Sequence, residues 1–121
     1  MGRFREITTK KGTKLLLGKN KEQNEELVKS FLGKSNTILH THAPGSPFCV
    51  IVEKPKIGDK KEAATYCAKY SQDWRDHKTD IKVNIFTGKE VYKEKIMPVG
   101  TFGVNKSKTV TVKKKDILKL K

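Results

Sequence analysis

The segment 38–52, ILHTHAPGSPFCVIV, constrains the fold of this chain more than any other stretch. It places the turn-forming run 44–47, PGSP, between two apolar runs of strand-forming residues. Proline fixes its own φ and glycine accepts a positive φ, so this run predicts a tight, pre-shaped turn. Apolar strands on both sides of a turn are typical of the centre of a sheet. The sequence therefore predicts a buried hairpin here.

Three polar side chains stand at the mouth of this hairpin. His40 and His42 precede the turn, and Ser46 lies within it. Two imidazoles and a hydroxyl held at the end of rigid strands are typical of a binding site. They are equally consistent with a well-formed turn whose rim is hydrated. The residues of the hairpin do not by themselves decide between these interpretations.

The rest of the chain predicts further short strands and two helices. Strands are expected in seven segments: 4–9, 14–18, 38–42, 48–52, 81–86, 90–93 and 108–113. One helix is predicted from an N-cap at Asn20, with Gln23 as its capping-box partner, to Gly33. A second begins at an N-cap, Asp59, with Glu62 completing its box. This order predicts an α+β fold, a mixed and mostly antiparallel sheet with two helices packed on it.

The second predicted helix carries one apolar face. Ala63, Cys67, Tyr70 and Trp74 recur every three or four residues, which places them on one side of a continuous helix. Small residues alternate with aromatic ones along this face, a pattern that helix–sheet packing needs. We therefore interpret the face as core rather than as a platform for stacking bases. The helix is expected to fray within the charged run 73–78.

The length of 121 residues suits one domain with a single core. We expect one domain over 1–121, whose basic C-terminal tail, 113–121, is partly docked through its apolar residues. The chain has no run of 18 apolar residues, and its first residues lack the apolar core of a signal peptide. Cys49 and Cys67 lie in apolar runs, which is typical of free buried thiols in a reducing compartment. We therefore expect a cytoplasmic protein that does not enter a membrane.

The net charge of +14 is concentrated at the two ends of the chain. Residues 1–21 carry seven basic residues and one acidic residue, and residues 106–121 carry the same numbers. The body between them has thirteen basic and eleven acidic residues. If the ends lie near one another, they form one basic face, which is typical of a polyanion-binding protein. The alternatives are a composition that only aids solubility, and an acidic protein or an anionic membrane as partner.

No motif for catalysis or metal binding accompanies the two histidines. His40 and His42 would point the same way from a strand and could in principle ligate zinc with a cysteine. However, C-x-x-C and H-E-x-x-H spacings are absent and both cysteines lie in apolar runs, so we predict no metal and no cofactor. Ser46 lies near His42, but no local acid orients either group, so no catalytic residue is assigned. A Walker-type phosphate loop is also absent.

Three blocks of the sequence resemble a known module over nearly the whole chain. The blocks are 4–27 with Gly18-Lys19-Asn20 and Asn24, then His40 with Pro44-Gly45-Ser46 and the following apolar strand, then 63–74 with Gly100-Thr101-Phe102. Together they resemble the NFACT-R domain, the C-terminal module of the fibronectin-binding protein A-like, NEMF-type ribosome quality control factors. The chain resembles a free-standing copy. It departs from bacterial relatives after Pro-Gly-Ser, where Pro47 and Phe48 replace a common histidine.

This resemblance implies a non-enzymatic RNA-binding domain that acts on rRNA or tRNA in translation or ribosome quality control, with the large ribosomal subunit as a platform. It agrees with the charge pattern, which predicts phosphate contacts from lysines and arginines and shape or base contacts from the hairpin mouth. The residues expected to contact RNA are Arg3, Arg5, Lys14, Lys19, Asn20, His40, His42, Ser46, Lys106, Lys108, Lys113, Lys114 and Lys115.

Two other functions remain open at this point. A small RNA-processing enzyme would use His40 or His42 as a general base, with a nearby lysine stabilising charge. An adaptor would instead bind a partner protein through its basic face. Asn20 also has two compatible roles, because a helix N-terminus binds anions and Lys19 beside it could hold a phosphate.

Overall fold

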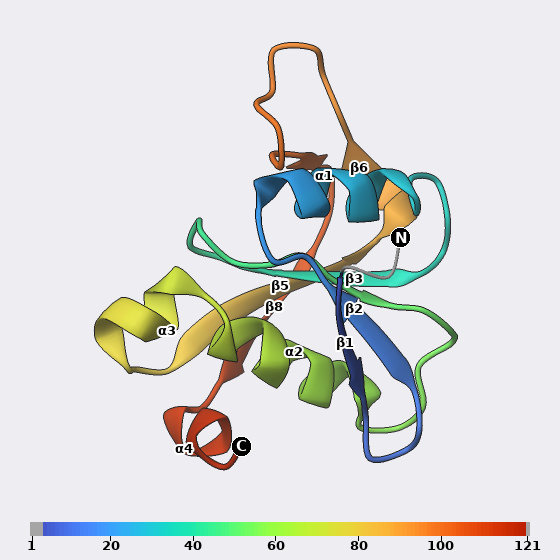
Figure 1. Ribbon diagram of the computed structural model, residues 1–121. Coiled ribbons are helices and arrows are strands. Elements are labelled where there is room, and N and C mark those ends of the chain that lie inside the picture. The colour runs from blue at the N-terminus through green and yellow to red at the C-terminus, as the bar shows by residue number, and fades with distance from the viewer. Residues whose placement is uncertain (1–3, 121) are drawn as a thin grey trace.

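The computed structural model describes residues 4–120, which form eight strands, four α-helices and one 3-10 turn (Figure 1). The elements follow in the order β1 (Arg5–Thr8), β2 (Lys14–Leu17), α1 (Lys21–Lys29), β3 (Thr37–Thr41), β4 (Cys49–Ile51), α2 (Asp59–Lys69), α3 (Gln72–His77), β5 (Ile81–Thr87), η1 (Gly88–Glu90), β6 (Val91–Tyr92), β7 (Gly103–Val104), β8 (Lys108–Val112) and α4 (Lys114–Leu118). The predicted α+β class is confirmed.

Six strands form one sheet in the order β1-β2-β4-β3-β5-β8, and β6 pairs with β7 in a small second sheet. Every pair of neighbouring strands is antiparallel. β3 and β4 occupy the centre, with Ile38 opposite Val50 and Leu39 opposite Cys49. The prediction that the segment 38–52 forms a central hairpin is therefore confirmed.

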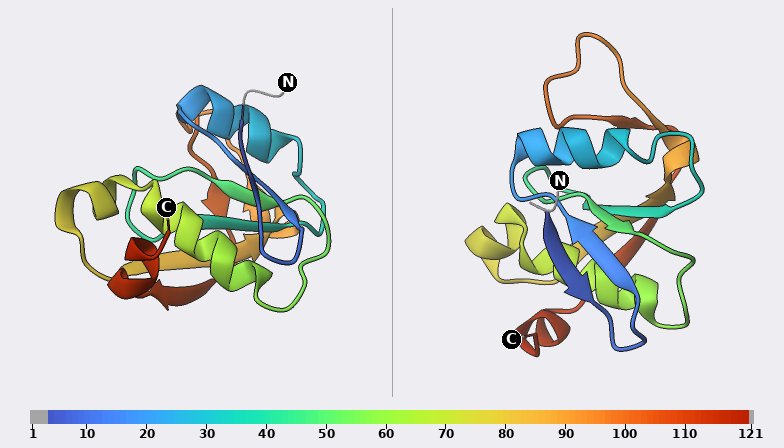
Figure 2. Two further views of the ribbon diagram at one scale, coloured as in Figure 1. Left: turned by 60° about the horizontal axis from the view of Figure 1, so that its bottom comes forward. Right: turned by 45° about the vertical axis from the view of Figure 1, so that its right-hand side comes forward.

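Helices cover both faces of this sheet (Figures 1 and 2). Successive strand residues point to opposite faces, so each central strand supplies two cores. Leu39 and Cys49 pack in one core with α2, α3 and α4. Ile38 and Val50 pack in the other with α1 and the β6–β7 sheet. The two free thiols, Cys49 and Cys67, are both buried, as predicted.

The helix boundaries differ from those predicted at three points. α1 ends at Lys29 rather than at Gly33, although Gly33 does adopt a positive φ of 78°. The segment predicted as one second helix forms two, α2 and α3, because the helix ends at Tyr70. Ser71 then caps α3, since its hydroxyl accepts a hydrogen bond from the Trp74 N–H. The run 73–78, expected to fray, is mostly within the ordered helix α3.

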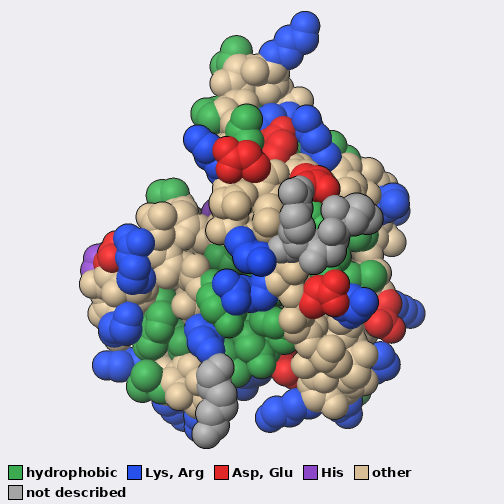
Figure 3. All heavy atoms as spheres, in the orientation of Figure 1, with side chains coloured by type: hydrophobic (Ala, Val, Ile, Leu, Met, Phe, Trp, Pro, Cys, Tyr) green, Lys and Arg blue, Asp and Glu red, His purple; other side chains and the backbone are tan. Residues whose placement is uncertain are grey.

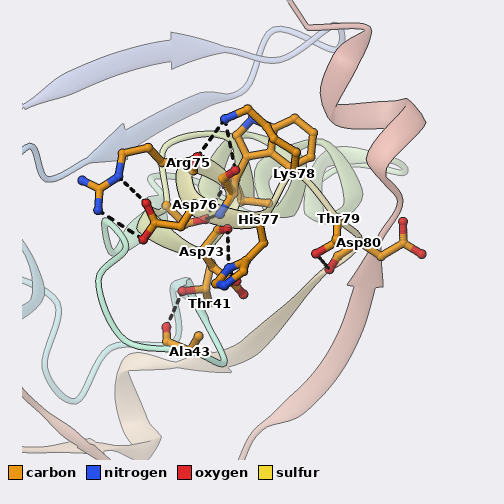
Figure 4. A network of polar contacts seen from close by, with 12 residues as sticks. Thr41, Ala43, Asp73, Arg75, Asp76, His77, Lys78, Thr79 and Asp80 are labelled. Carbon is orange, nitrogen blue, oxygen red and sulfur yellow. Dashed lines mark hydrogen bonds and ion pairs between the residues drawn. The ribbon is translucent and has the colours of Figure 1, made fainter.

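The break at Ser71 also splits the predicted apolar face. Ala63 and Cys67 on α2 are buried, and Trp74 packs in the same core from α3. Tyr70 is 37% exposed, and the guanidinium of Arg5 lies 4.0 Å above its ring. α3 has its own surface network, in which Asp73 pairs with His77, and Arg75 with Asp76 (Figure 4).

Asp59 does not cap α2, so this prediction is wrong. The N-cap is Gly58, and the Asp59 side chain is fully buried. It accepts hydrogen bonds from the hydroxyls of Thr9 and Thr13 and from the Lys56 N–H. The predicted partner Glu62 accepts from the Lys10 N–H instead. These carboxylates therefore join α2 to the β1–β2 turn, because packing places the Thr9 and Thr13 hydroxyls and the Lys10 N–H within hydrogen-bond distance of them.

The predicted N-cap of α1 is confirmed. The Asn20 Oδ1 accepts from the Gln23 N–H at 2.8 Å. The Gln23 side chain accepts from the Lys19 N–H rather than from that of Asn20, so the predicted capping box is displaced by one residue.

The two basic ends of the chain lie at opposite edges of the sheet, since β1 and β8 are its outer strands. Lys and Arg side chains are spread around the face in Figure 3 instead of gathering in one patch. The two basic ends therefore do not lie near one another, as a single basic face built from both would require.

In the C-terminal segment, Ile117 of α4 is buried in the core with α2. No helix within residues 4–120 has the length and apolar character needed to span a membrane.

Candidate nucleic-acid interface

A polar area remains on the sheet face that α1 covers only in part. Ile38 and Phe86 lie under α1. Two residues further along the same face, His40 of β3 lies opposite Asn84 of β5. Asn84 in turn lies opposite Thr109 of β8. The next positions on this face, His42, Lys82 and Thr111, are exposed to solvent. The uncovered half of the face is thus polar, whereas the covered half is apolar.

A groove of about 650 Å³ lies over this polar area. It is bounded by the start of α1, by the β3–β4 loop with the start of α3, and by the segment 99–104. In Figure 1 the β3–β4 loop lies between α1 and α3, and Figure 3 shows the surface hollowed between the parts that carry these two helices. Tertiary structure therefore brings four separate segments of the chain to one concave site.

His40 is held in one orientation at the base of the groove. Its Nδ1 lies 2.8 Å from the Thr41 carbonyl oxygen, and its ring centroid lies 4.4 Å from that of Phe48. Burial lowers the pKa of His40 below its ordinary value of 6.5, an effect that the contact with Thr41 only partly offsets. The imidazole is therefore neutral at neutral pH.

Aromatic side chains form one wall of the groove. Phe48 is 4% exposed, and it packs edge-on against Phe102 with 5.7 Å between ring centroids. Tyr70 lies on another side of the groove beneath the guanidinium of Arg5. The site therefore combines apolar ring surface with cationic groups at its rim, a combination typical of nucleic-acid binding sites.

The β3–β4 loop is held by hydrogen bonds of its own polar groups. The Ser46 hydroxyl accepts from the Thr41 N–H at 3.1 Å and donates to the Pro47 carbonyl. The Thr41 hydroxyl donates to the Ala43 carbonyl at 2.6 Å, a contact drawn in Figure 4. Gly45, with a φ of 90°, accepts from the Gln72 N–H. Ser46 is thus 8% exposed and shapes the loop, so its hydroxyl offers little to a ligand.

Asn24 joins α1 to the strand that leaves this loop. Its Oδ1 accepts from the Phe48 N–H at 3.0 Å, and its Nδ2 donates to the Ser46 carbonyl at 3.4 Å. A Cβ on Gly18 would lie 2.1 Å from that Oδ1, so only glycine permits this approach. These contacts set the start of α1, with Lys19 and Lys21, against the groove.

The thirteen predicted contact residues separate into groups. Those that line the groove are Arg5, Lys19, Asn20, His40, His42 and Ser46. Six others do not line the groove: Lys14, Lys106, Lys108, Lys113, Lys114 and Lys115. The Lys14 ammonium group lies 3.8 Å from the Glu6 carboxylate. Lys113–Lys115 border a shallow depression with Asp80 and Leu118. Arg3 lies outside the described residues. The hairpin mouth, Arg5 and the start of α1 therefore form one site, and the lysines 113–115 belong to another surface.

The surroundings of the two groove histidines were compared with the arrangements that nucleophilic catalysis and metal binding need. Within residues 4–120, no carboxylate contacts His40 or His42, so neither imidazole has the orienting acid of a nucleophile–base pair. No group of three or more histidine, cysteine or acidic residues in that range is placed to hold a metal ion. Burial also raises the pKa of the Cys67 thiol to about 12, which leaves it unreactive.

Residues 3–106 match the family of NFACT protein RNA binding domains. The chain belongs to this family. The match spans the groove and all the elements that build it. Membership of a family of RNA-binding domains supports RNA as the partner of this NFACT-R domain. No curated protein sequence matches the chain.

The fold is also similar to a solved structure, the C-terminal of the fibronectin/fibrinogen-binding protein from Streptococcus suis. The TM-score is 0.82 at 24% sequence identity, and the likeness covers 93% of this chain. It covers 46% of the other chain, so this NFACT-R domain spans less than half of that solved chain. At this identity the likeness supports the fold alone.

Several groove residues were not predicted as contacts. Three of them are Asn84, Lys21 and Phe102. The sequence patterns placed Asn84 in a strand, Lys21 in a helix and Phe102 in a bend, without a role in binding. One signal for Asn84 was available, since it is a polar residue between the apolar Val83 and Ile85 in a central strand. Asn84 lies beside His40 because β5 pairs with β3, and this pairing cannot be read from the sequence.

Proposed function

We propose that this NFACT-R domain binds rRNA or tRNA in the cytoplasm, in translation or ribosome quality control, and that it does so without catalysing a reaction. The observation that carries the proposal is the groove, because it joins a cationic rim, aromatic walls and a polar floor in a member of an RNA-binding family. Phosphates would meet Arg5, Lys19 and Lys21 at the rim. The large ribosomal subunit is the platform we favour.

Equilibrium binding to labelled tRNA and rRNA fragments at increasing salt tests this proposal. If about five cations of the domain meet phosphates, log K falls with log salt at a slope of roughly −4. A flat salt dependence, or no binding at low salt, would contradict the proposal.

A pair of charge-matched variants tests whether the groove is the RNA site. Lys19→Glu with Lys21→Glu reverses two charges at the rim, whereas Lys10→Glu with Lys11→Glu reverses two exposed charges in the β1–β2 turn. The rim variant is expected to lose at least tenfold more affinity than the turn variant. Equal losses would show that net charge rather than the groove determines binding. Lys113→Glu, Lys114→Glu and Lys115→Glu together measure the contribution of the α4 surface.

Two further experiments address the class of RNA and the absence of catalysis. Crosslinking in cells followed by sequencing of the bound RNA is expected to enrich rRNA or tRNA, and sedimentation is expected to place the protein with large subunits. Purified protein is expected to yield no cleavage products from labelled RNA, with or without divalent metal. Products that disappear on replacing His40 would favour an RNA-processing enzyme instead.

A further inference from the structure

We propose that the groove holds an unpaired base, so that the domain prefers RNA with a bulged, looped or terminal unpaired nucleotide over continuous duplex. This inference rests on the proposed RNA-binding function of the same groove and names the kind of RNA that it takes. Two neighbouring side chains of the floor, His40 and Asn84, carry the argument together with the size of the groove.

The first floor group is a hydrogen-bond acceptor. A carbonyl oxygen can only accept, so the contact between His40 Nδ1 and the Thr41 carbonyl requires the hydrogen to be on Nδ1. The neutral imidazole has one N–H, and Nε2 therefore carries a lone pair. Phe48 against the ring and the Thr41 carbonyl together hold this tautomer and orientation. His40 thus presents an acceptor to the groove that it lines.

The second floor group is a hydrogen-bond donor. Asn84 lies directly opposite His40 in the β3–β5 ladder, where side chains of paired residues are about 5 Å apart. The Thr109 hydroxyl donates to Asn84 Oδ1 at 2.9 Å, which orients the amide. Its NH₂ group is left to donate, and among residues 4–120 no acceptor is recorded for it. The strand pairing therefore sets an acceptor beside a donor.

An acceptor beside a donor complements the Watson–Crick edge of a base. Each of the four bases has an N–H donor next to a nitrogen or oxygen acceptor on that edge. In a duplex, base pairing occupies these groups, and the deep, narrow major groove of A-form RNA hides them further. A base can meet His40 and Asn84 in this way only if it is unpaired. The floor accepts any base in principle, so the preference is for structure rather than for sequence.

The dimensions and walls of the groove favour the same ligand. Its volume of about 650 Å³ lies within the range of about 300–1,000 Å³ that small-ligand pockets occupy. A ligand of nucleotide size fits this space. Phe102, which is half-buried and backed by Phe48, supplies apolar ring surface beside the floor, and Arg5 and Lys19 line the same groove for the flanking phosphates.

The test compares four RNAs built on one loop-free stem of two annealed strands: a blunt-ended perfect stem, a stem with one bulged adenosine, a stem with an abasic bulge, and a stem with a single-stranded 3′ overhang. Fluorescence anisotropy at one salt concentration gives their Kd values. The bulged adenosine or the overhang is expected to bind about tenfold tighter than the perfect stem and the abasic bulge, since 1.4 kcal/mol is a factor of ten. Comparing the bulge with the overhang separates an internal nucleotide from a chain end.

Protein variants test the two floor groups. His40→Phe keeps a ring against Phe48 but removes the acceptor, and Asn84→Ala removes the donor. Each is expected to bring the ratio of bulged to perfect-stem affinity close to one. His77→Phe is the matched control, because His77 is an exposed imidazole on α3 that does not line the groove. It is expected to leave the ratio unchanged.

Equal Kd values for the perfect stem, the adenosine bulge and the overhang would overturn the inference while leaving RNA binding intact. An abasic bulge that gains the same affinity over the perfect stem as the adenosine bulge would overturn it as well. Loss of binding to every RNA by the unmodified domain would instead contradict the proposed function, and this inference with it. Thermal unfolding checks that each variant is folded. If His40→Phe does not fold, Asn84→Ala and the abasic RNA still decide the outcome.

Discussion

The Glu25 carboxylate on α1 accepts a hydrogen bond from the Lys93 ammonium group at 2.9 Å, and both side chains are at least four-fifths buried. The same Glu25 oxygen accepts from the Gly100 N–H at 2.7 Å. Lys93 also donates to the carbonyls of Pro98 and Thr101. One ion pair therefore ties the projecting β6–β7 connection, residues 93–102, to the helix whose start bounds the groove (Figure 1).

Replacing Glu25 by Gln is expected to destabilise the domain by about 2 kcal/mol, because hydrogen bonds to charged groups contribute about 1.5–3 kcal/mol. The neutral amide also leaves the ammonium group of Lys93 without its carboxylate. Urea unfolding at pH 7 measures the change. Glu94→Gln, an exposed position on the same connection, is the control and is expected to stay within about 0.5 kcal/mol of the unmodified domain.

The contribution of Glu25 is expected to vanish in acid. Burial acts to raise its pKa, but the hydrogen bonds from Gly100, Lys93 and Lys29 outweigh it and lower the pKa from 4.5 to about 2. The unfolded chain therefore binds this proton first as the pH falls. The stabilisation is fully present above pH 4.5 and is lost as the pH falls through about 2. Unfolding curves of Glu25→Gln and the unmodified domain should converge between these values, and a constant difference would contradict the assignment.

Replacing Asn24 by Ala is expected to cost about 2 kcal/mol, since the buried Phe48 N–H and Ser46 carbonyl both lose a partner. The start of α1 should also loosen against the β3–β4 loop and weaken RNA binding. Urea unfolding and anisotropy measure the two effects. Asn105→Ala at an exposed position is the matched control. If both variants are equally stable, Asn24 does not join α1 to this loop.

Replacing Asp59 by Asn is expected to lower the Tm measured by circular dichroism. The amide has one acceptor oxygen, whereas the buried carboxylate accepts from Thr9, Thr13 and Lys56. The hydrogen bond from Thr13 is the main cause of the lowered pKa of Asp59, so the carboxylate is ionised at neutral pH. Exposed Asp76→Asn on α3 should change the Tm much less. An unchanged Tm for Asp59→Asn would exclude its role in holding the β1–β2 turn.

Neither thiol of the folded domain is expected to react with a thiol reagent at pH 8. Cys49 and Cys67 have no exposed surface, and burial raises the pKa of both, to about 12 for Cys67. Two equivalents should react once the domain is unfolded in urea, which provides the positive control. Rapid reaction of one thiol in the folded domain would indicate that the core around α2 opens.

Local features of the fold were predictable because they depend on neighbours in the sequence. Asn20 caps α1 because its side chain needs only the N–H of Gln23, three residues away. Asp59 shows the opposite case, since its side chain binds Thr9 and Thr13 from about fifty residues away in preference to its own helix end. Which donors reach a carboxylate is decided by packing, and a capping pattern does not contain that information.

By itself, the sequence determined the central hairpin 38–52, the α+β class and the polar groups, His40 and His42, that line the groove. These follow from residue chemistry over short distances, such as strand-forming runs on both sides of a proline–glycine turn. Only the tertiary structure decided that Asn84 lies beside His40 and that the two basic ends lie at opposite edges of the sheet. The physical reason is that strand order and register result from burying two apolar faces at once, a property of the whole chain.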